Sequence, residues 1–249
     1  MKLKQRLLSL LLVICLVAGL LPNAVLAAGT DSGKAIQLGV SGIKDPTEVT
    51  DDKGKYYTPN SYVYFGVNSE SSNTPIKWRV LDADKANNNS TAGMFLLSEY
   101  LLASGVKFNE DGNVWQDSKA QSWCKTYAES PSNFSTAEQA AMLGVAKTDN
   151  KDRLYGLSWG AISLTDQDEM FFLSARELSD YVGNYDYAPG LAATFVGGST
   201  GDWWLRSPDA DHATGAGAVR NYSHVFNSYV DVARAARPAF NLEPVFISV

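Results

Sequence analysis

The pentapeptide GLSWG at 156–160 has the G-x-S-x-G spacing that places a nucleophilic serine on a sharp turn in α/β-hydrolases. Aspartates and both histidines, His212 and His224, follow it in the order that this chemistry needs. A nucleophile elbow also requires a buried strand before it and a helix after it. Here the polar run KTDNKDRLYG precedes the serine, and AISLTDQDE, with the pattern of a strand and a loop, follows it. The sequence therefore favours a serine in an ordinary turn.

Metal chemistry has little support in the sequence. It contains no CxxC, no HExxH and no close pair of histidines. The run DADHATG at 209–215 begins like a calcium loop, but it lacks a third ligand at the next alternate position and a distant closing glutamate. Asp166, Asp168 and Glu169 form a second acidic cluster, of a kind usual in solvated turns. We expect no metal and no cofactor. A pair of catalytic carboxylates stays open, because their separation in space is invisible in a sequence.

Tryptophans are candidates for stacking against sugar rings. Five of the six are such candidates: Trp78, Trp115, Trp123, Trp203 and Trp204. Trp78, Trp123 and one of the adjacent pair fall at core-like phases of their segments, which favours a packing role for these three. Cys124 shares the apolar stripe of its helical segment, so we expect a buried and inert thiol.

The strongest candidate for ligand recognition is the segment from 209 to 229. We predict an inner strand over Trp203–Ser207, whose pairing ends at Pro208 because proline lacks an N–H group. A mobile loop over Asp209–Gly217 and paired strands over Val219–Tyr222 and Ser228–Ala233 would follow. Seven side chains would then crowd the loop end of one sheet: His212, Arg220, Asn221, Tyr222, His224, Asn227 and Tyr229. Tyrosine and asparagine supply adaptable contacts on such loops. An ordinary solvated loop is the alternative.

The elements that would position these residues follow the order strands, helices, strands. β-rich or alternating runs occupy AIQLGV, SYVYFGV, IKWRVLDA and GMFLLSEYLL. Short helices are expected after Ser118, Ser135 and Ser174, each followed three residues later by Gln or Glu in the capping-box spacing. Strands return from Trp203 onward. This order predicts an α+β domain with mixed or antiparallel sheets and a few short helices.

The first 27 residues have the composition of a secretory signal peptide. Three basic residues precede the apolar run Leu7–Leu21, and Val25-Leu26-Ala27 supplies a cleavage site. A short leader at 28–34 and a single domain over 35–249 would remain. The whole chain has 21 basic and 27 acidic residues, and cleavage removes three of the basic ones. The resulting charge of −9 disfavours nucleic-acid and anionic-membrane partners. We expect a secreted protein with no membrane span after cleavage, retained at a cell surface only through a partner.

A series of ordered motifs resembles a family of unknown function found in secreted and surface proteins of anaerobic Gram-positive bacteria. The resemblance covers roughly Tyr62 to Ile247. Its motifs are WRVL at 78–81, FLLS at 95–98, WxDS at 115–118, FSxxE at 134–138, FFLSxxE at 171–177, WWLRSP at 203–208 and ARPAFNL at 236–242. Ala236 departs from the glycine or valine usual before Arg-Pro. The resemblance implies a C-type-lectin-like fold, akin to sulfatase-modifying factors, in which a tryptophan strand pairs with a final arginine-bearing strand.

That resemblance implies structural roles for Trp204, Arg206 and Arg237. Period 2 places Trp204 and Arg206 on one strand face, and both arginines can hold carbonyls or carboxylates as buried forks. The sulfatase-modifying branch depends on cysteine and metal chemistry, and the single mature cysteine argues against transferring that activity. The sequence favours a non-catalytic module that binds a glycan, a cell-wall polymer or a protein. The alternatives are a secreted polymer hydrolase, with paired carboxylates in one cleft, and a purely structural surface-assembly domain without a concave pocket.

Overall fold

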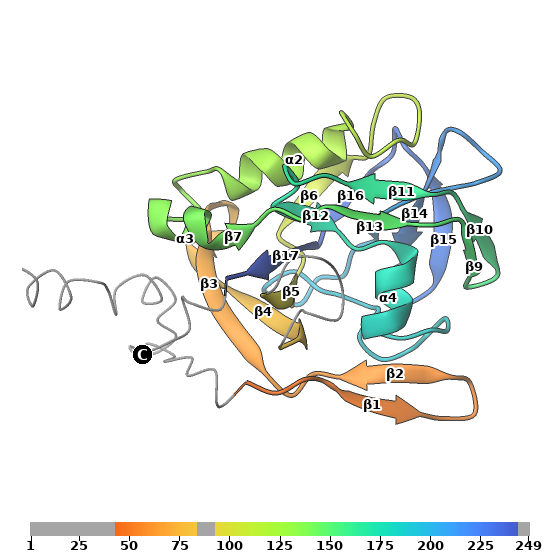
Figure 1. Cartoon of the computed structure of the whole chain (residues 1–249), viewed down its shortest axis with the longest axis horizontal. Helices are drawn as coiled ribbons and strands as arrows, with labels where there is room; N and C mark the ends of the chain where they lie inside the picture. The colour runs from red at the N-terminus through yellow and green to blue at the C-terminus, as the bar shows by residue number, and fades with distance from the viewer. Residues whose placement is uncertain (1–42, 84–92, 244–249) are drawn as a thin grey trace, which may run out of the picture.

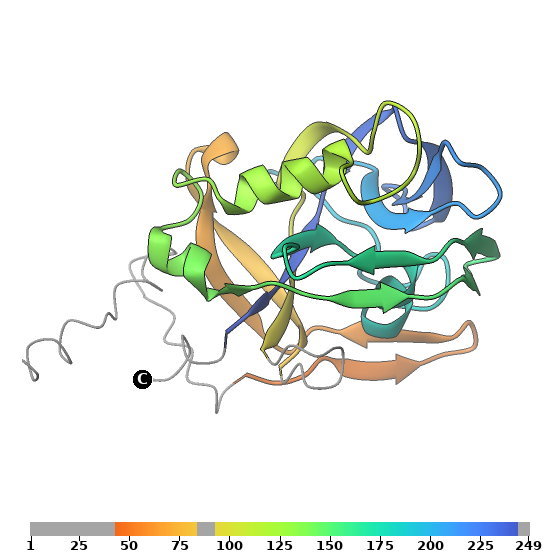
Figure 2. The same cartoon turned by 45° about the horizontal axis from the view of Figure 1, so that its top comes forward.

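The computed structural model describes residues 43–83 and 93–243 (Figure 1). The expected signal peptide, the leader and the AIQLGV strand lie outside these residues. The described part forms an α+β structure of mostly antiparallel strands with three α-helices. None of these helices is long and apolar enough to cross a membrane. Helix α2 (Lys119–Ala128) lies on one side of the molecule, and the hairpin of β1 (Thr47–Thr50) and β2 (Lys55–Thr58) lies on the opposite side (Figures 1 and 2).

The larger sheet is built around the C-terminal strand β17. Its strand order is β12 (Met170–Phe172), β17 (Pro238–Leu242), β5 (Met94–Ser98), β4 (Thr74–Asp82) and β3 (Tyr62–Asn68), with β7 (Met142–Leu143) also on β17. The similar segments MFLLS and MFFLS therefore flank the same strand, so that Ala239 pairs with both Leu97 and Phe171. All pairs in this sheet are antiparallel.

The second sheet carries the tryptophan strand in an interior position. Its order is β15 (Val225–Tyr229), β14 (Gly215–Val219), β13 (Trp203–Pro208), β16 (Ala233–Ala236) and β6 (Ala103–Lys107). β13 meets β16 in parallel at Trp203 and Ala235, and β16 ends just before Arg237. The backbone N–H of Arg206 donates to the Leu173 carbonyl at 2.9 Å, which joins the two sheets.

The strand boundaries after Pro208 differ from the predicted ones. β13 does end at Pro208, but Gly215–Gly217, predicted as loop, is the first part of β14. The predicted bounds of the two following strands, Val219–Tyr222 and Ser228–Ala233, are wrong. Residues 220–224 form the turn between β14 and β15. Glycine is placed in this strand by close packing. A Cβ atom on Gly217 would lie 3.1 Å from the Trp159 ring, so a larger residue would fit only if the ring moved by a few tenths of an ångström.

Two short hairpins and the three helices complete the described part. β8 (Lys147–Asp149) pairs with β11 (Ile162–Leu164), and β9 (Asp152–Leu154) pairs with β10 (Leu157–Trp159). Helices α2, α3 (Thr136–Ala141) and α4 (Ala175–Tyr181) begin after the three serines that the sequence marked. Each serine hydroxyl accepts the N–H three residues on, and the helices at Ser135 and Ser174 have complete capping boxes.

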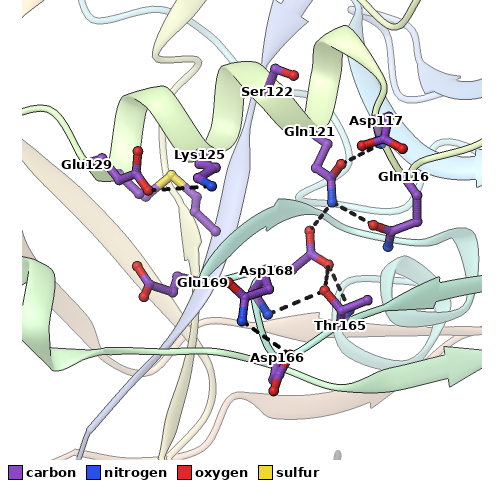
Figure 3. A pocket seen from close by; sticks show the side chains of 13 residues that line it. Gln116, Asp117, Gln121, Ser122, Lys125, Glu129, Thr165, Asp166, Asp168 and Glu169 are labelled. Carbon is purple, nitrogen blue, oxygen red and sulfur yellow. Dashed lines mark hydrogen bonds and ion pairs between the residues drawn. The ribbon is translucent and has the colours of Figure 1, made fainter.

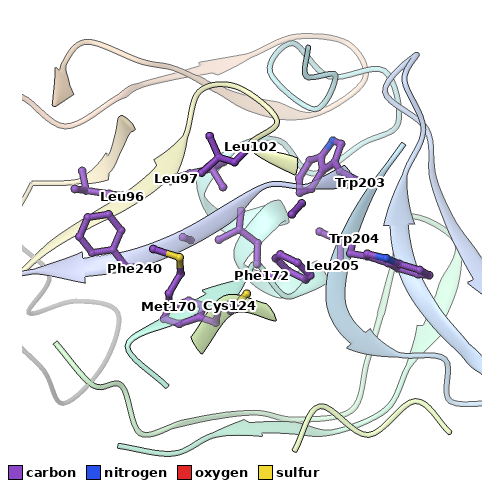
Figure 4. Close-up of a cluster of buried hydrophobic side chains, with 14 of the residues drawn as sticks. Leu96, Leu97, Leu102, Cys124, Met170, Phe172, Trp203, Trp204, Leu205 and Phe240 are labelled. Atoms are coloured by element: carbon purple, nitrogen blue, oxygen red, sulfur yellow. The ribbon is translucent and has the colours of Figure 1, made fainter. Parts of the chain in front are cut away.

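The core joins both sheets to helix α2. Phe240, Met170 and Phe172 from the larger sheet belong to the same buried cluster as Trp203, Trp204 and Leu205 of β13 (Figure 4). All the tryptophans are buried except Trp123, which is half-buried and stacks on Tyr127 with centroids 4.9 Å apart. Cys124 is fully buried, and burial holds the pKa of its thiol well above the ordinary value. The tryptophans and the thiol are thus packing residues.

Candidate functional site

Two exposed tyrosines and a half-buried histidine form a cluster at the β14–β15 turn, which we call the ring cluster: Tyr187, Tyr222 and His224. The ring centroids are 6.1–6.4 Å apart in every pair, and the ring planes differ by only 13–29°. Equal separations mean that no ring lies between the other two as in a column. Tyr187 is 60% exposed and Tyr222 54% exposed, unusually high for large aromatic residues. The cluster therefore offers aligned and partly exposed ring surface to a ligand.

Backbone hydrogen bonds hold the ring cluster in place. Tyr187 and Ser223 both have left-handed backbone conformations, with φ of +68° and +70°. They are joined directly, because the Tyr187 N–H donates to the Ser223 carbonyl at 2.7 Å. The Ser223 hydroxyl also accepts from the Ala192 N–H at 3.0 Å. Left-handed non-glycine residues cost free energy and persist where the surroundings fix them, often at binding sites.

Two aspartates outside the turn fix its path. Asp186 accepts the Val225 N–H at 2.9 Å, and its other oxygen lies 2.9 Å from Nδ1 of His224. Asp202 accepts the Asn221 N–H at 3.0 Å. The same carboxylate pairs with Arg234 at 2.6 Å. The turn is thus tied to the β13 side of the sheet and to the 185–192 segment before it.

A separate group of the predicted residues surrounds Asp209. Its buried carboxylate lies 3.0 Å from Nδ1 of His212 and accepts a hydrogen bond from the Asn227 side chain at 2.7 Å. The side-chain amide of Asn113 donates to the Asp209, His212 and Gly215 carbonyls. Hydrogen bonds therefore fix the 209–214 loop at several points, whereas the sequence predicted a mobile loop over Asp209–Gly217.

The seven predicted ligand-binding residues do not form one group. Gly215 pairs with Tyr229 at one end of the hairpin, and Val219 pairs with Val225 at the other. Four residue steps at strand geometry separate these ends by about 13 Å. His212, Asn227 and Tyr229 lie toward the first end, whereas Arg220, Asn221, Tyr222 and His224 lie at the second. The expectation that all seven crowd one end of the sheet is wrong.

Tyr187 is the member of the ring cluster that the sequence reasoning missed. It comes from the segment NYDYAPG at 184–190, far from the β14–β15 turn in the sequence. A signal was present, since two tyrosines stand in a run of turn-forming residues, where large aromatic side chains are seldom needed for packing. Arg220 is also near the turn, but its guanidinium lies over the Phe226 ring at 4.0 Å.

A polar cavity of about 520 Å³ lies between α2 and the 165–170 turn (Figure 3). Five carboxylates line it: Asp117, Glu129, Asp166, Asp168 and Glu169. Asp168 accepts hydrogen bonds from the Trp115 ring at 3.0 Å and from the Gln121 amide at 2.9 Å. Its second oxygen accepts from the Thr165 N–H at 2.7 Å. The hydrogen bonds of Asp168 thus connect the 165–170 turn to α2 and to Trp115.

Glu169 has a different environment in that cavity. Partial burial, and then the negative charge of Glu129, raise the pKa of Glu169, while Lys125 lowers it. A carboxyl group with a raised pKa beside other carboxylates is the type of group that donates a proton in hydrolases. In the described ranges no group of three or more histidine, cysteine or acidic side chains could hold a metal ion.

The GLSWG segment adopts strand β10 rather than a nucleophile elbow. Ser158 pairs with Arg153 across the β9–β10 hairpin, and its carbonyl accepts the Ala210 N–H at 3.1 Å. No helix follows the serine, because the chain continues into β11. The acyl-transfer arrangement is therefore absent at this segment.

Comparison with known proteins gives one match. Residues 91–244 fit the model of a family described as a domain of unknown function, DUF6273. The match begins at residue 91, after the first motif of the series, WRVL at 78–81, and includes the later ones. No curated protein and no solved structure matches the chain.

Proposed function

The chain belongs to the DUF6273 family, and because that family has no assigned function, we propose from the geometry that it is a non-catalytic binding module recognising a glycan through the ring cluster. The observation that carries the proposal is the alignment of Tyr187, Tyr222 and His224 on an exposed turn. The faces of pyranose rings present C–H groups, which pack favourably against the negative faces of aromatic rings. Aligned rings can therefore contact one or more sugar units of a chain.

Polar groups next to the ring cluster supply orientation. Arg220 and Asn221 immediately precede Tyr222 in the same turn. Nδ1 of His224 lies 2.9 Å from an Asp186 oxygen, and the ring nitrogens offer a donor and an acceptor that can orient a sugar hydroxyl. Ligand sites commonly combine apolar and aromatic surface with a few oriented polar groups. Because the backbone of the turn is held before a ligand arrives, little ordering entropy is lost on binding.

The proposed setting is outside the cell. The signal-peptide composition of residues 1–27, the acidic charge and the motif resemblance to surface proteins of anaerobic Gram-positive bacteria support it. A C-type-lectin-like fold is part of the proposal. It is supported by two small sheets, few helices and a tryptophan strand paired with the strand before Arg237.

A polymer hydrolase is the second candidate, favoured by Glu169. This acid lies in the polar cavity with four other carboxylates and has a raised pKa. The Glu169→Gln variant should abolish any release of reducing sugar from a wall polymer, if that activity exists. A wild-type protein that binds the polymer without cleaving it supports the binding module. The concave cavities argue against a purely structural surface-assembly domain.

The test is a glycan and cell-wall array probed with the mature protein. The double variant Tyr187→Ala/Tyr222→Ala should lose at least tenfold in affinity for whichever glycan the wild type binds. Tyr229→Ala is the matched control, because Tyr229 is 70% exposed but lies at the other end of the hairpin. Both variants should melt near the wild-type temperature, since neither removes buried surface. Equal losses in both variants, or unchanged binding in the double variant, would contradict the ring cluster as the site.

A further inference from the structure

A second cavity has a volume of about 490 Å³. Strands β3 and β4 line one side of it, and a turn at 194–200, which we call the flap, lines the other. We call the cavity the flap pocket. Ten residues line it: Tyr64, Thr74, Pro75, Lys77, Tyr100, Thr194, Phe195, Val196, Gly197 and Gly198. Its volume falls in the range of small-molecule sites, roughly 300–1,000 Å³. A smaller cavity of about 170 Å³ also touches Phe195 and Val196. The flap thus separates two hollows on the surface.

The base of the flap is fixed and its tip is not packed. Thr194 pairs with Thr200, and the Thr194 carbonyl accepts the Leu101 N–H at 2.8 Å. At the tip, Gly197 and Gly198 have φ of +101° and +93°, which side-chain-bearing residues rarely adopt. A Cβ atom on either glycine would meet no heavy atom within 4 Å. The tip can therefore adjust to a ligand while the base keeps Phe195 in position.

The lining combines three rings with one positive charge. Tyr64, Tyr100 and Phe195 provide flat apolar surface, and Thr194 provides a hydroxyl group. Lys77 is the only charged residue among the ten that line the pocket. Its ammonium lies 3.8 Å from the centre of the Tyr62 ring, and no carboxylate pairs with it in the described part of the chain. In a protein with a formal charge of −6, this lining carries one positive charge and no negative one, which favours an anionic ligand.

We propose that the flap pocket binds a hexuronic acid unit, a pyranose that carries a carboxylate. The C–H face of the sugar packs on the rings of Tyr100 and Phe195, the carboxylate pairs with the Lys77 ammonium, and sugar hydroxyls bond to Thr194. A neutral pyranose leaves the Lys77 charge unpaired, and a simple carboxylate such as acetate leaves the rings uncovered. Acidic sugar is the ligand class that matches both parts of the lining.

This inference does not rest on the ring cluster. The flap pocket and the ring cluster use different residues. The Asn221 amide of the β14–β15 turn donates to the Thr200 hydroxyl at the base of the flap at 3.4 Å. Tyr187→Ala/Tyr222→Ala should therefore leave uronate binding unchanged. Failure of one proposal leaves the other standing.

The experiment is calorimetric titration of the mature protein with trigalacturonate, with maltotriose as the neutral comparison and acetate as the small anion. We expect binding of the uronate alone, weakened by added salt because a charge pair contributes. Lys77→Gln should reduce the affinity at least tenfold, whereas Lys77→Arg, which keeps the charge, should retain it within about threefold. Lys53→Gln, in the exposed β1–β2 turn, is the control and should bind as the wild type does.

Phe195→Ala tests the apolar half of the pocket and should also weaken trigalacturonate binding at least tenfold. Circular dichroism melting curves would show that each variant folds. Equal binding of maltotriose, equal binding of acetate, unchanged affinity in Lys77→Gln or the absence of trigalacturonate binding would each overturn the proposal.

Discussion

Arg206 and Arg237 are both fully buried, yet their surroundings differ in kind. Arg206 donates to the Phe172 carbonyl and pairs with two carboxylates, Glu177 and Asp149, the latter at 2.6 Å. Arg237 donates to the backbone carbonyls of Ser98 and Gly190, both at 3.0 Å, and lies 4.9 Å from the Trp203 ring centre. The charge of Arg206 is neutralised by carboxylates, whereas that of Arg237 is stabilised by carbonyl dipoles and the face of the Trp203 ring.

The pKa values of the two guanidinium groups move in opposite directions. Burial lowers the pKa of Arg206, but the charges of Glu177 and then Asp149 outweigh it, so the net shift is upward. Burial, followed by repulsion from Arg79, holds the pKa of Arg237 well below its ordinary value, with Glu99 opposing. Removing a carboxylate beside Arg206 should therefore lower the free energy of unfolding far more than removing Arg237 itself does.

The largest expected effect is that of Glu177→Gln. Glutamine keeps the capping role at the start of α4, where Glu177 accepts the Ser174 N–H at 3.0 Å. It removes one negative charge from a buried group that also includes Lys147 at 2.9 Å. Uncompensated buried charge costs about 3–5 kcal/mol, and urea denaturation should show a loss of that size. Asp152→Asn, which breaks the partly exposed pair with Arg176, should cost less than about 1 kcal/mol.

The acid dependence of stability should come next in size. Burial raises the pKa of Glu177, but Arg206 and Lys147 lower it more strongly, to about 2 from an ordinary value of 4.5. A depressed folded-state pKa stabilises the protein above the unfolded pKa, so this contribution is complete above pH 5. It is lost as the pH falls from about 4.5 through 2, and amounts to about 3 kcal/mol. Urea denaturation measured at successively lower pH should show the free energy of unfolding falling steeply between pH 4.5 and 2 in the wild type. The fall should be shallower in Glu177→Gln.

Among the changes at the buried charged groups, the smallest expected effect is that of Arg237→Met. Methionine fills a similar volume and removes the cost of burying a cation, but it leaves the Ser98 and Gly190 carbonyls without donors. These opposing contributions should leave a net loss of about 1–2 kcal/mol. Arg206→Met, measured in the same way, should lose about 3–5 kcal/mol because two carboxylates lose their partner. Similar losses in both variants would contradict the distinction between the sites.

Sequence reasoning could reach local features of these sites but not their partners. The capping box marked Glu177, and period 2 marked Arg206 as one face of a strand. Their meeting depends on how α4 packs against β13, which no local pattern encodes. The same limit applies to the ring cluster, because Tyr187 reaches Tyr222 through a long loop. The glycines of β14 led to the wrong prediction of a loop over Gly215–Gly217. Glycine is typical of loops, but it also occurs in strands that a bulky side chain approaches closely, as Trp159 approaches Gly217.

The turn between β14 and β15 has its backbone held by acceptors that lie outside it. Asp202 binds the Asn221 N–H and Asp186 binds the Val225 N–H. Neither bond uses the side chains at positions 222 and 224. A change of residue type at these two positions would therefore alter the outward surface without moving the main chain. The turn can diversify through evolution, or be rewritten by protein engineering, while the domain beneath it keeps one shape.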